Sequence, residues 1–124
     1  MPTTPEEFLE LARESVDRPG AQERHWRDAT RCAHDAVYMT VAGALALDTA
    51  TFSGSHRAVG EALFAQPRSG LTGFLRLARR HWNTLWLARL RAERDLEDAV
   101  GEADARLSIL IAESILAARR SELQ

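Results

Sequence analysis

Arginine is the residue type with the clearest chemical meaning in this chain. Seven arginines and a single acidic residue, Glu93, lie between Arg68 and Arg94, so this segment carries a charge of +6 (seven minus one) in a protein whose net charge is −2. Guanidinium groups gathered in this way are typical of surfaces that bind phosphate. The alternative is a helix whose arginines pair with acidic residues of a neighbouring helix or subunit. The sequence leaves both interpretations open.

Helical periodicity predicts that these arginines do not all lie on the same side of the helix. At about 100° per residue, Arg76, Arg80, Arg91 and Arg94 fall on one side of the helix expected here, and we call these four residues the arginine face. Arg89 falls instead within the apolar side, where an unpaired guanidinium would carry a heavy desolvation cost. We therefore expect Arg89 to have an acidic partner or an opening to solvent. The expected apolar side consists of Leu71, Leu75, Ala78, Trp82, Leu85 and Trp86.

Metal and redox chemistry find little support in the sequence. The four histidines show none of the spacings that bind metals, such as His-Glu-x-x-His or Cys-x-x-Cys. We expect no metal site and no cofactor. The single cysteine, Cys32, is expected to be a buried structural thiol. All 16 basic residues are arginine, which excludes Schiff-base and P-loop lysine chemistry.

The elements that must position these side chains are all predicted to be helices, in a four- to five-helix bundle. Thr4 can cap the first helix, Pro5 suits its first position, and residues 17–20 end it. Further helices are expected at about 25–47, from near Ser55 to before Pro67, from about Thr72 with a break at 95–101, and at about 102–121. The apolar side of the last helix is expected to be Leu107, Leu110, Ile111, Ser114, Ile115 and Ala118.

Length and hydropathy predict one domain, residues 1–124, in the cytoplasm. The longest uninterrupted apolar run is Val41–Leu47, far shorter than the roughly 20 residues that a membrane span needs. The first ten residues have no basic region and no small-residue cleavage pattern, so no secretory signal is expected. We expect no membrane partner.

Three segments resemble signature motifs of the HEPN superfamily, the nucleotide-binding domains of prokaryotes and higher eukaryotes. The first segment is similar to the family's Ser-Arg-Ala-Tyr-Tyr-Ala-x-Phe-His-Ala-Ala helix but lacks its tyrosine pair; it reads Thr30-Arg31-Cys32-Ala33-His34-Asp35-Ala36-Val37-Tyr38. Ser55-His56-Arg57-Ala58-Val59 resembles the Thr-His-x-x-Val/Ile helix start. Leu90-Arg91-Ala92-Glu93-Arg94-Asp95-Leu96 resembles Leu-Arg-x-x-Ala-Asp-Tyr, with Leu96 in place of the tyrosine.

This resemblance implies a helical bundle that pairs as a homodimer, often encoded beside a nucleotidyltransferase in toxin–antitoxin or defence settings. The ribonuclease branch of the superfamily uses an arginine followed after four to six residues by histidine. Arg91 matches that arginine, but Asp95 stands four residues later and no histidine follows at that spacing. Asp95 can act as a base, yet its anionic form would repel phosphate.

Other residues match the catalytic spacing or the signature positions. Arg76 precedes His81 by five residues, although on one continuous helix the two side chains lie well apart in angle. His34 is a further candidate for moving protons. Arg31 is expected to form an ion pair with Asp35 one helical turn later, and Arg91 is expected to do the same with Asp95. Arg31 is also a further candidate phosphate ligand, in addition to the arginine face.

Three functions follow from these patterns. The first is a non-catalytic HEPN-like dimer that binds RNA, a nucleotide or a partner nucleotidyltransferase through Arg76, Arg80, Arg91 and Arg94. The second is a metal-independent ribonuclease toxin in which arginine stabilises the transition-state charge and His81 or His34 moves protons. The third is a structural dimerisation module whose arginines are buried against acids of the other subunit.

Overall fold

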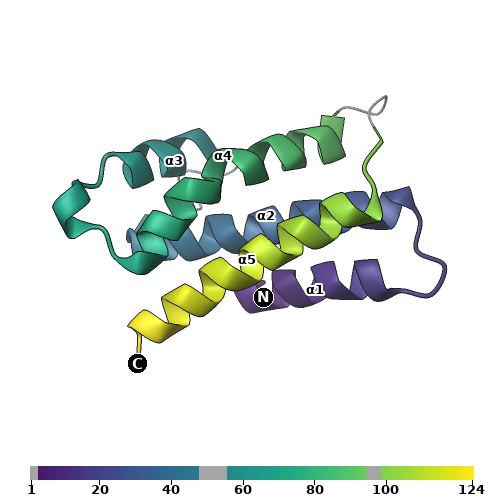
Figure 1. Ribbon diagram of the computed structural model, residues 1–124, viewed down its shortest axis with the longest axis horizontal. Coiled ribbons are helices and arrows are strands. Elements are labelled where there is room, and N and C mark those ends of the chain that lie inside the picture. The colour runs from purple at the N-terminus through teal and green to yellow at the C-terminus, as the bar shows by residue number, and fades with distance from the viewer. Residues whose placement is uncertain (1–2, 48–55, 95–98) are drawn as a thin grey trace.

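Every regular element that the structure describes is a helix. The computed structural model describes residues 3–47, 56–94 and 99–124, and among them are five α-helices and one short 3-10 helix. The elements are α1 Pro5–Asp17, α2 Glu23–Ala44, α3 His56–Phe64, η1 Arg68–Gly70, α4 Gly73–Arg94 and α5 Glu102–Glu122. The prediction of an all-α bundle is therefore confirmed for the described residues (Figure 1).

Local sequence accounts for the ends of the first two helices. The Glu7 backbone N–H donates to Thr4 Oγ1 over 3.1 Å, the capping bond that the sequence predicted. α2 begins two residues earlier than expected, because the Gln22 backbone N–H donates to His25 Nδ1 over 2.9 Å and caps the first turn. α2 ends at Ala44 because Ala46 adopts a left-handed φ of 56° and Leu47 N–H donates back to Ala42 O over 2.8 Å.

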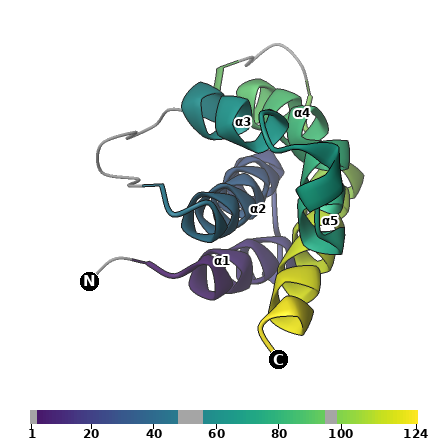
Figure 2. The ribbon, with the colours of Figure 1, turned by 90° about the vertical axis from the view of Figure 1, so that its left-hand side faces the viewer.

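The second helix is the centre of the bundle. α2 packs against α1, α3, α4 and α5 (Figures 1 and 2). Ala29, Ala33 and Ala36 are fully buried along its core side, and these small side chains allow neighbouring helices to approach closely. Small residues therefore form much of the core side of α2. Cys32 departs from the expectation, since it is only half-buried, and burial raises the pKa of its thiol.

The fourth helix has most of the predicted core. Leu75, Ala78, Trp82 and Leu85 are buried, whereas Leu71 and Trp86 are half-buried. Phe74, which the periodicity did not select, is 1% exposed. Its backbone N–H donates to Glu122 Oε1 over 2.8 Å, so the end of α5 caps the start of α4.

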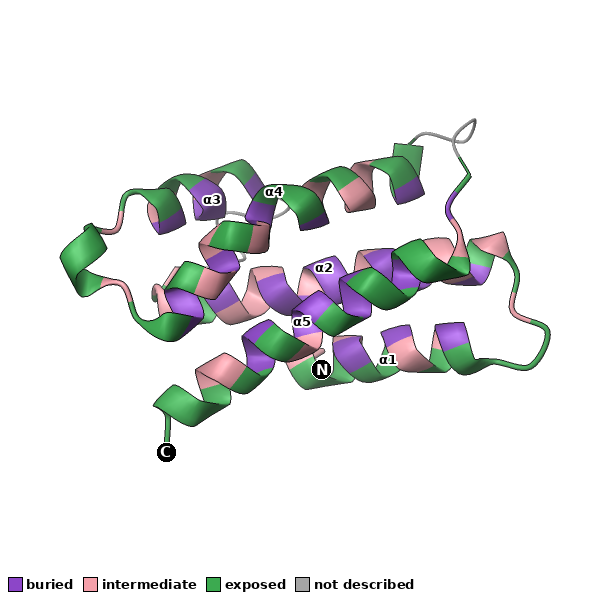
Figure 3. Ribbon diagram, viewed as in Figure 1, coloured by how far each residue is buried: buried purple, intermediate pink, exposed green. Residues whose placement is uncertain are grey.

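The predicted apolar side of α5 is wrong in part. Leu107 and Leu110 are 54% and 62% exposed, and Ser114 is exposed as well. α5 is apolar around most of its circumference, so the positions of α1, α2 and α4 decide which residues are covered (Figure 3). The side that packs inward consists of Ala105, Ser108, Ile109, Ile111, Ala112, Ile115 and Leu116.

Arg27 ties the start of α2 to the end of α4. Its guanidinium donates to the carbonyl oxygens of Arg91 over 2.8 Å and Ala92 over 3.1 Å, which stabilises the carbonyl end of α4. Glu23 Oε2 accepts from Arg27 over 2.8 Å and from the Val100 backbone N–H over 3.3 Å. The predicted break after α4 is confirmed, because the helix ends at Arg94, although residues 95–98 lie outside the described residues.

In the part of the chain that the structure describes, no helix is both long enough and apolar enough to span a membrane.

Candidate functional site

The arginine face lies on the outer side of α4. Arg76, Arg80, Arg91 and Arg94 are all exposed. The first and the last are eighteen residues apart, which is about 27 Å along a helix at roughly 1.5 Å per residue. Figure 3 shows α4 with its buried side toward the bundle and exposed residues along the outside.

Acidic residues in the described part of the chain do not neutralise three of these four arginines. Arg76, Arg80 and Arg94 form no ion pair with any described residue. Arg91 donates from Nη2 to the Ala99 carbonyl oxygen over 3.0 Å. The interpretation in which neighbouring helices of the same chain neutralise the arginines is therefore not favoured for Arg76, Arg80 and Arg94.

Three arginines converge at the start of α4. Arg68, Leu71, Arg76 and Arg79 line a hollow of about 320 Å³, and none of the described acidic residues lines it. η1 brings Arg68 to this place: Gly70 N–H donates to Pro67 O over 2.9 Å and Leu71 N–H to Arg68 O over 3.3 Å. Helical periodicity could not find this group, because Arg68 precedes the helix. We call Arg68, Arg76 and Arg79 the arginine pocket.

Arg79 has two further contacts that fix its direction. Its Nη1 donates to the Gln66 carbonyl oxygen over 3.3 Å, and its Cζ lies 5.1 Å from the centre of the Phe64 ring. A guanidinium over an aromatic ring is held by the negative ring face and keeps donors available at its edge. Arg79 is thus a fixed side of the arginine pocket.

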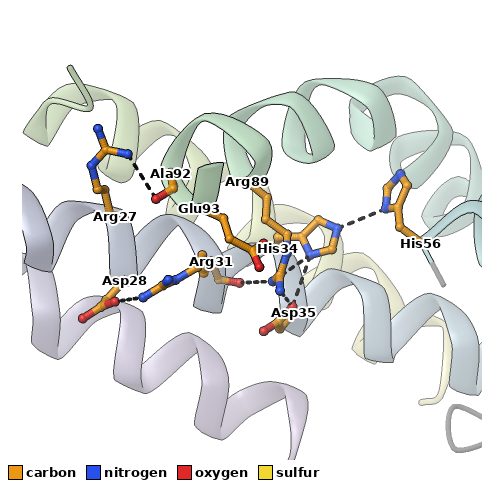
Figure 4. Close-up of polar contacts among 9 residues, drawn as sticks. All are labelled: Arg27, Asp28, Arg31, His34, Asp35, His56, Arg89, Ala92 and Glu93. Atoms are coloured by element: carbon orange, nitrogen blue, oxygen red, sulfur yellow. Dashed lines mark hydrogen bonds and ion pairs between the residues drawn. The ribbon is translucent and has the colours of Figure 1, made fainter. Parts of the chain in front are cut away.

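A second polar group lies between α2, α3 and α4. His34 Nδ1 is 3.2 Å from Asp35 Oδ1, and His34 Nε2 is 3.1 Å from His56 Nδ1. Arg89 forms an ion pair with Asp35, and its Nη1 is 3.5 Å from His34 Nδ1 (Figure 4). We call His34, Asp35, His56 and Arg89 the histidine cluster.

Both histidines of this cluster are neutral near pH 7. Burial lowers the pKa of His34, with the hydrogen bond to Asp35 acting in the opposite direction. Burial, together with the nearby His34 and Arg89, lowers the pKa of His56 to about 4. Because Asp35 is the closer neighbour of His34 Nδ1, that nitrogen carries the proton and His34 Nε2 accepts from His56. His56 Nε2 is then an acceptor.

Arg89 meets the expectation of an acidic partner. Besides Asp35, its Nε lies 3.4 Å from Glu93 Oε2, and its Nη1 donates to the Arg31 carbonyl oxygen over 3.4 Å. The predicted Arg31–Asp35 pair is wrong, since Arg31 pairs with Asp28 (Figure 4). The Arg89 side chain is 22% exposed and the Arg31 side chain 40%, so the more buried guanidinium has the greater need of the Asp35 carboxylate.

The candidate catalytic residues are not brought together. Arg76 and His81 lie on one uninterrupted helix, five residues and therefore about 140° apart. His34 is 5% exposed and faces the histidine cluster. Asp95, the expected partner of Arg91, lies outside the described residues.

Comparison with known proteins gives no match. No family model, no curated protein and no solved structure matches this chain. Function must therefore follow from the geometry of the molecule. Within residues 3–47, 56–94 and 99–124, no group of three or more His, Cys, Asp or Glu side chains is placed to hold a metal ion.

Proposed function

We propose that this chain is a HEPN-like helical protein that binds single-stranded RNA through the arginine face and the arginine pocket, as a homodimer and without catalysis of its own. The observation that carries the proposal is the exposure of Arg76 and Arg80 beside Arg68 and Arg79, in a pocket that no acid of residues 3–47, 56–94 and 99–124 lines. Phosphates spaced along a strand suit guanidinium groups spread along one helix.

Binding is favoured over cleavage because, in the part of the chain that the structure describes, neither candidate histidine accompanies the arginines. Arg76 and His81 point to different sides of α4, and His34 is buried. The resemblance to the HEPN superfamily adds the expectation of a toxin–antitoxin or defence setting. A partner nucleotidyltransferase is the protein ligand that the same resemblance implies.

Fluorescence anisotropy of a labelled single-stranded RNA in EDTA, measured over a series of salt concentrations, tests the proposal. We compare wild type with the Arg76→Ala/Arg80→Ala variant and with Arg13→Ala/Arg24→Ala, which removes the same charge from α1 and α2. The α4 variant should bind at least about tenfold more weakly. Its slope of log K against log salt should fall by about 1.4, at roughly 0.7 for each lost phosphate contact.

The outcomes separate the alternatives. An equal loss in both double variants would mean that only net charge matters, and the arginine face would not be the site. Cleavage of the RNA in EDTA, read on a gel from the same samples, would favour the ribonuclease hypothesis. No binding at any salt concentration would refute RNA as the ligand and direct the search to a protein partner.

A further inference from the structure

An aromatic groove lies between α3 and α4, next to the arginine pocket. It has a volume of about 780 Å³, and three aromatic side chains, Phe64, Trp82 and Trp86, line it together with Gly60, Asn83 and His56. Phe64 is 44% exposed and so offers a large apolar surface to solvent. Among the described lining residues, Arg57 and Glu61 are the charged ones, and they form an exposed ion pair over 3.0 Å that leaves no net charge between them.

The groove has polar groups that can contact the edge of a flat ring. His56 lines it and stacks on Trp86, with ring centres 4.1 Å apart and an angle of 12° between the planes. Its Nδ1 is engaged by His34, while its Nε2 forms no hydrogen bond with a described residue. A neutral His56 therefore presents an acceptor at Nε2. The exposed Asn83 amide adds both a donor and an acceptor.

The aromatic groove and the arginine pocket have a common wall. Phe64 lines the groove, and Arg79, which lies over the Phe64 ring, lines the arginine pocket. A ligand with a planar ring and an adjoining phosphate can therefore contact aromatic walls on one side of Arg79 and guanidinium groups on the other. Unpaired nucleic-acid bases have this combination of a stacking face, hydrogen-bonding edge and neighbouring phosphate.

We propose that the aromatic groove is a base-binding subsite of the RNA site. An unpaired base lies in the groove against the Phe64 ring, and a neighbouring phosphate contacts the arginine pocket. This inference rests on the proposed RNA binding. It adds that the bases, and not the phosphates alone, contribute to affinity.

Two strands of equal length and charge test the subsite. A labelled uridine oligomer and an abasic ribose-phosphate strand are titrated with wild type, with Phe64→Ala and with Leu11→Ala. Leu11 is 46% exposed on α1, away from α4, and does not line the groove, so it controls for the loss of an exposed apolar side chain. Wild type should bind the uridine oligomer about 5- to 150-fold more tightly than the abasic strand, which is the range that stacking of one base provides.

Phe64→Ala should lose most of this preference and Leu11→Ala should keep it. Equal affinity of wild type for the two strands would overturn the subsite while leaving RNA binding through the arginines intact. Binding of neither strand would refute the proposed function as well. Equal losses in Phe64→Ala and Leu11→Ala would also overturn the subsite.

Tryptophan fluorescence gives a measurement that needs no variant. Uridine monophosphate should quench the emission of wild type by entering the groove that Trp82 and Trp86 line, whereas ribose 5-phosphate should not. Identical responses to the two compounds would refute base stacking in the groove.

Discussion

Replacing Gly60 by alanine should destabilise the protein, although alanine is the better helix former. Gly60 lies inside α3, and a Cβ atom there would stand 2.6 Å from Trp82 Nε1 and 3.4 Å from Trp82 Cδ1 and Cε2. The indole has little freedom to move away. Trp82 is 3% exposed and stacks on His56, with ring centres 4.6 Å apart.

Two opposing effects set the size of the change. Alanine in place of glycine inside a helix stabilises by about 1 kcal/mol, and forcing an extra methyl into a packed core costs about 1–3 kcal/mol. Gly60→Ala should therefore lower the free energy of unfolding by about 0–2 kcal/mol. Gly43→Ala in α2 is the matched control, because a Cβ atom there meets nothing within 4 Å. That change should be neutral or stabilise by up to about 1 kcal/mol.

Urea unfolding followed by far-UV circular dichroism measures both variants against wild type. The decisive quantity is the difference between the two free energies of unfolding, expected to be about 1–3 kcal/mol in favour of Gly43→Ala. A Gly60→Ala variant as stable as Gly43→Ala would show that α3 does not press against Trp82, and the shape of the aromatic groove would have to be revised.

Two further predictions concern the same side of the bundle. Trp82→Ala removes a buried side chain and should lower the free energy of unfolding by about 3–5 kcal/mol in urea; a variant of wild-type stability would place Trp82 outside the core. The pKa of His56 is lowered from 6.5 to about 4 in the folded state, so the unfolded chain binds the proton more readily and stability should fall as pH drops from about 6.5 toward 4. His56→Phe should lose this part of the pH dependence, and equal dependence in wild type and variant, measured by urea unfolding at several pH values, would contradict the depressed pKa.

The beginning of α1 could be predicted because it depends on neighbouring residues. Thr4 and Pro5 define the start of α1 through a capping bond and a fixed backbone angle, both of which are local. The apolar side of α4 could also be predicted, since its apolar and charged residues are well separated around the helix. The same separation placed the arginine face outside and predicted that Arg89 needs an acid.

The sequence could not decide contacts that depend on how helices cross. α5 is apolar on several sides, so only its packing against α2 and α4 determined that Leu107 and Leu110 face outward. Asp35 is one turn from Arg31 in the chain, yet it pairs with Arg89 because α4 brings a more buried guanidinium within reach.

The sequence by itself thus determined an all-helical chain with an arginine-rich outer side on one helix, because both properties follow from spacing along a single helix. Only the tertiary structure decided that Arg68 joins Arg76 and Arg79, and that His34 meets His56. These groups combine residues from different elements. Their contacts depend on turns and on the angles at which helices cross, which the spacing of residues along one helix does not predict. The aromatic groove arises in the same way, from the packing of α3 against α4.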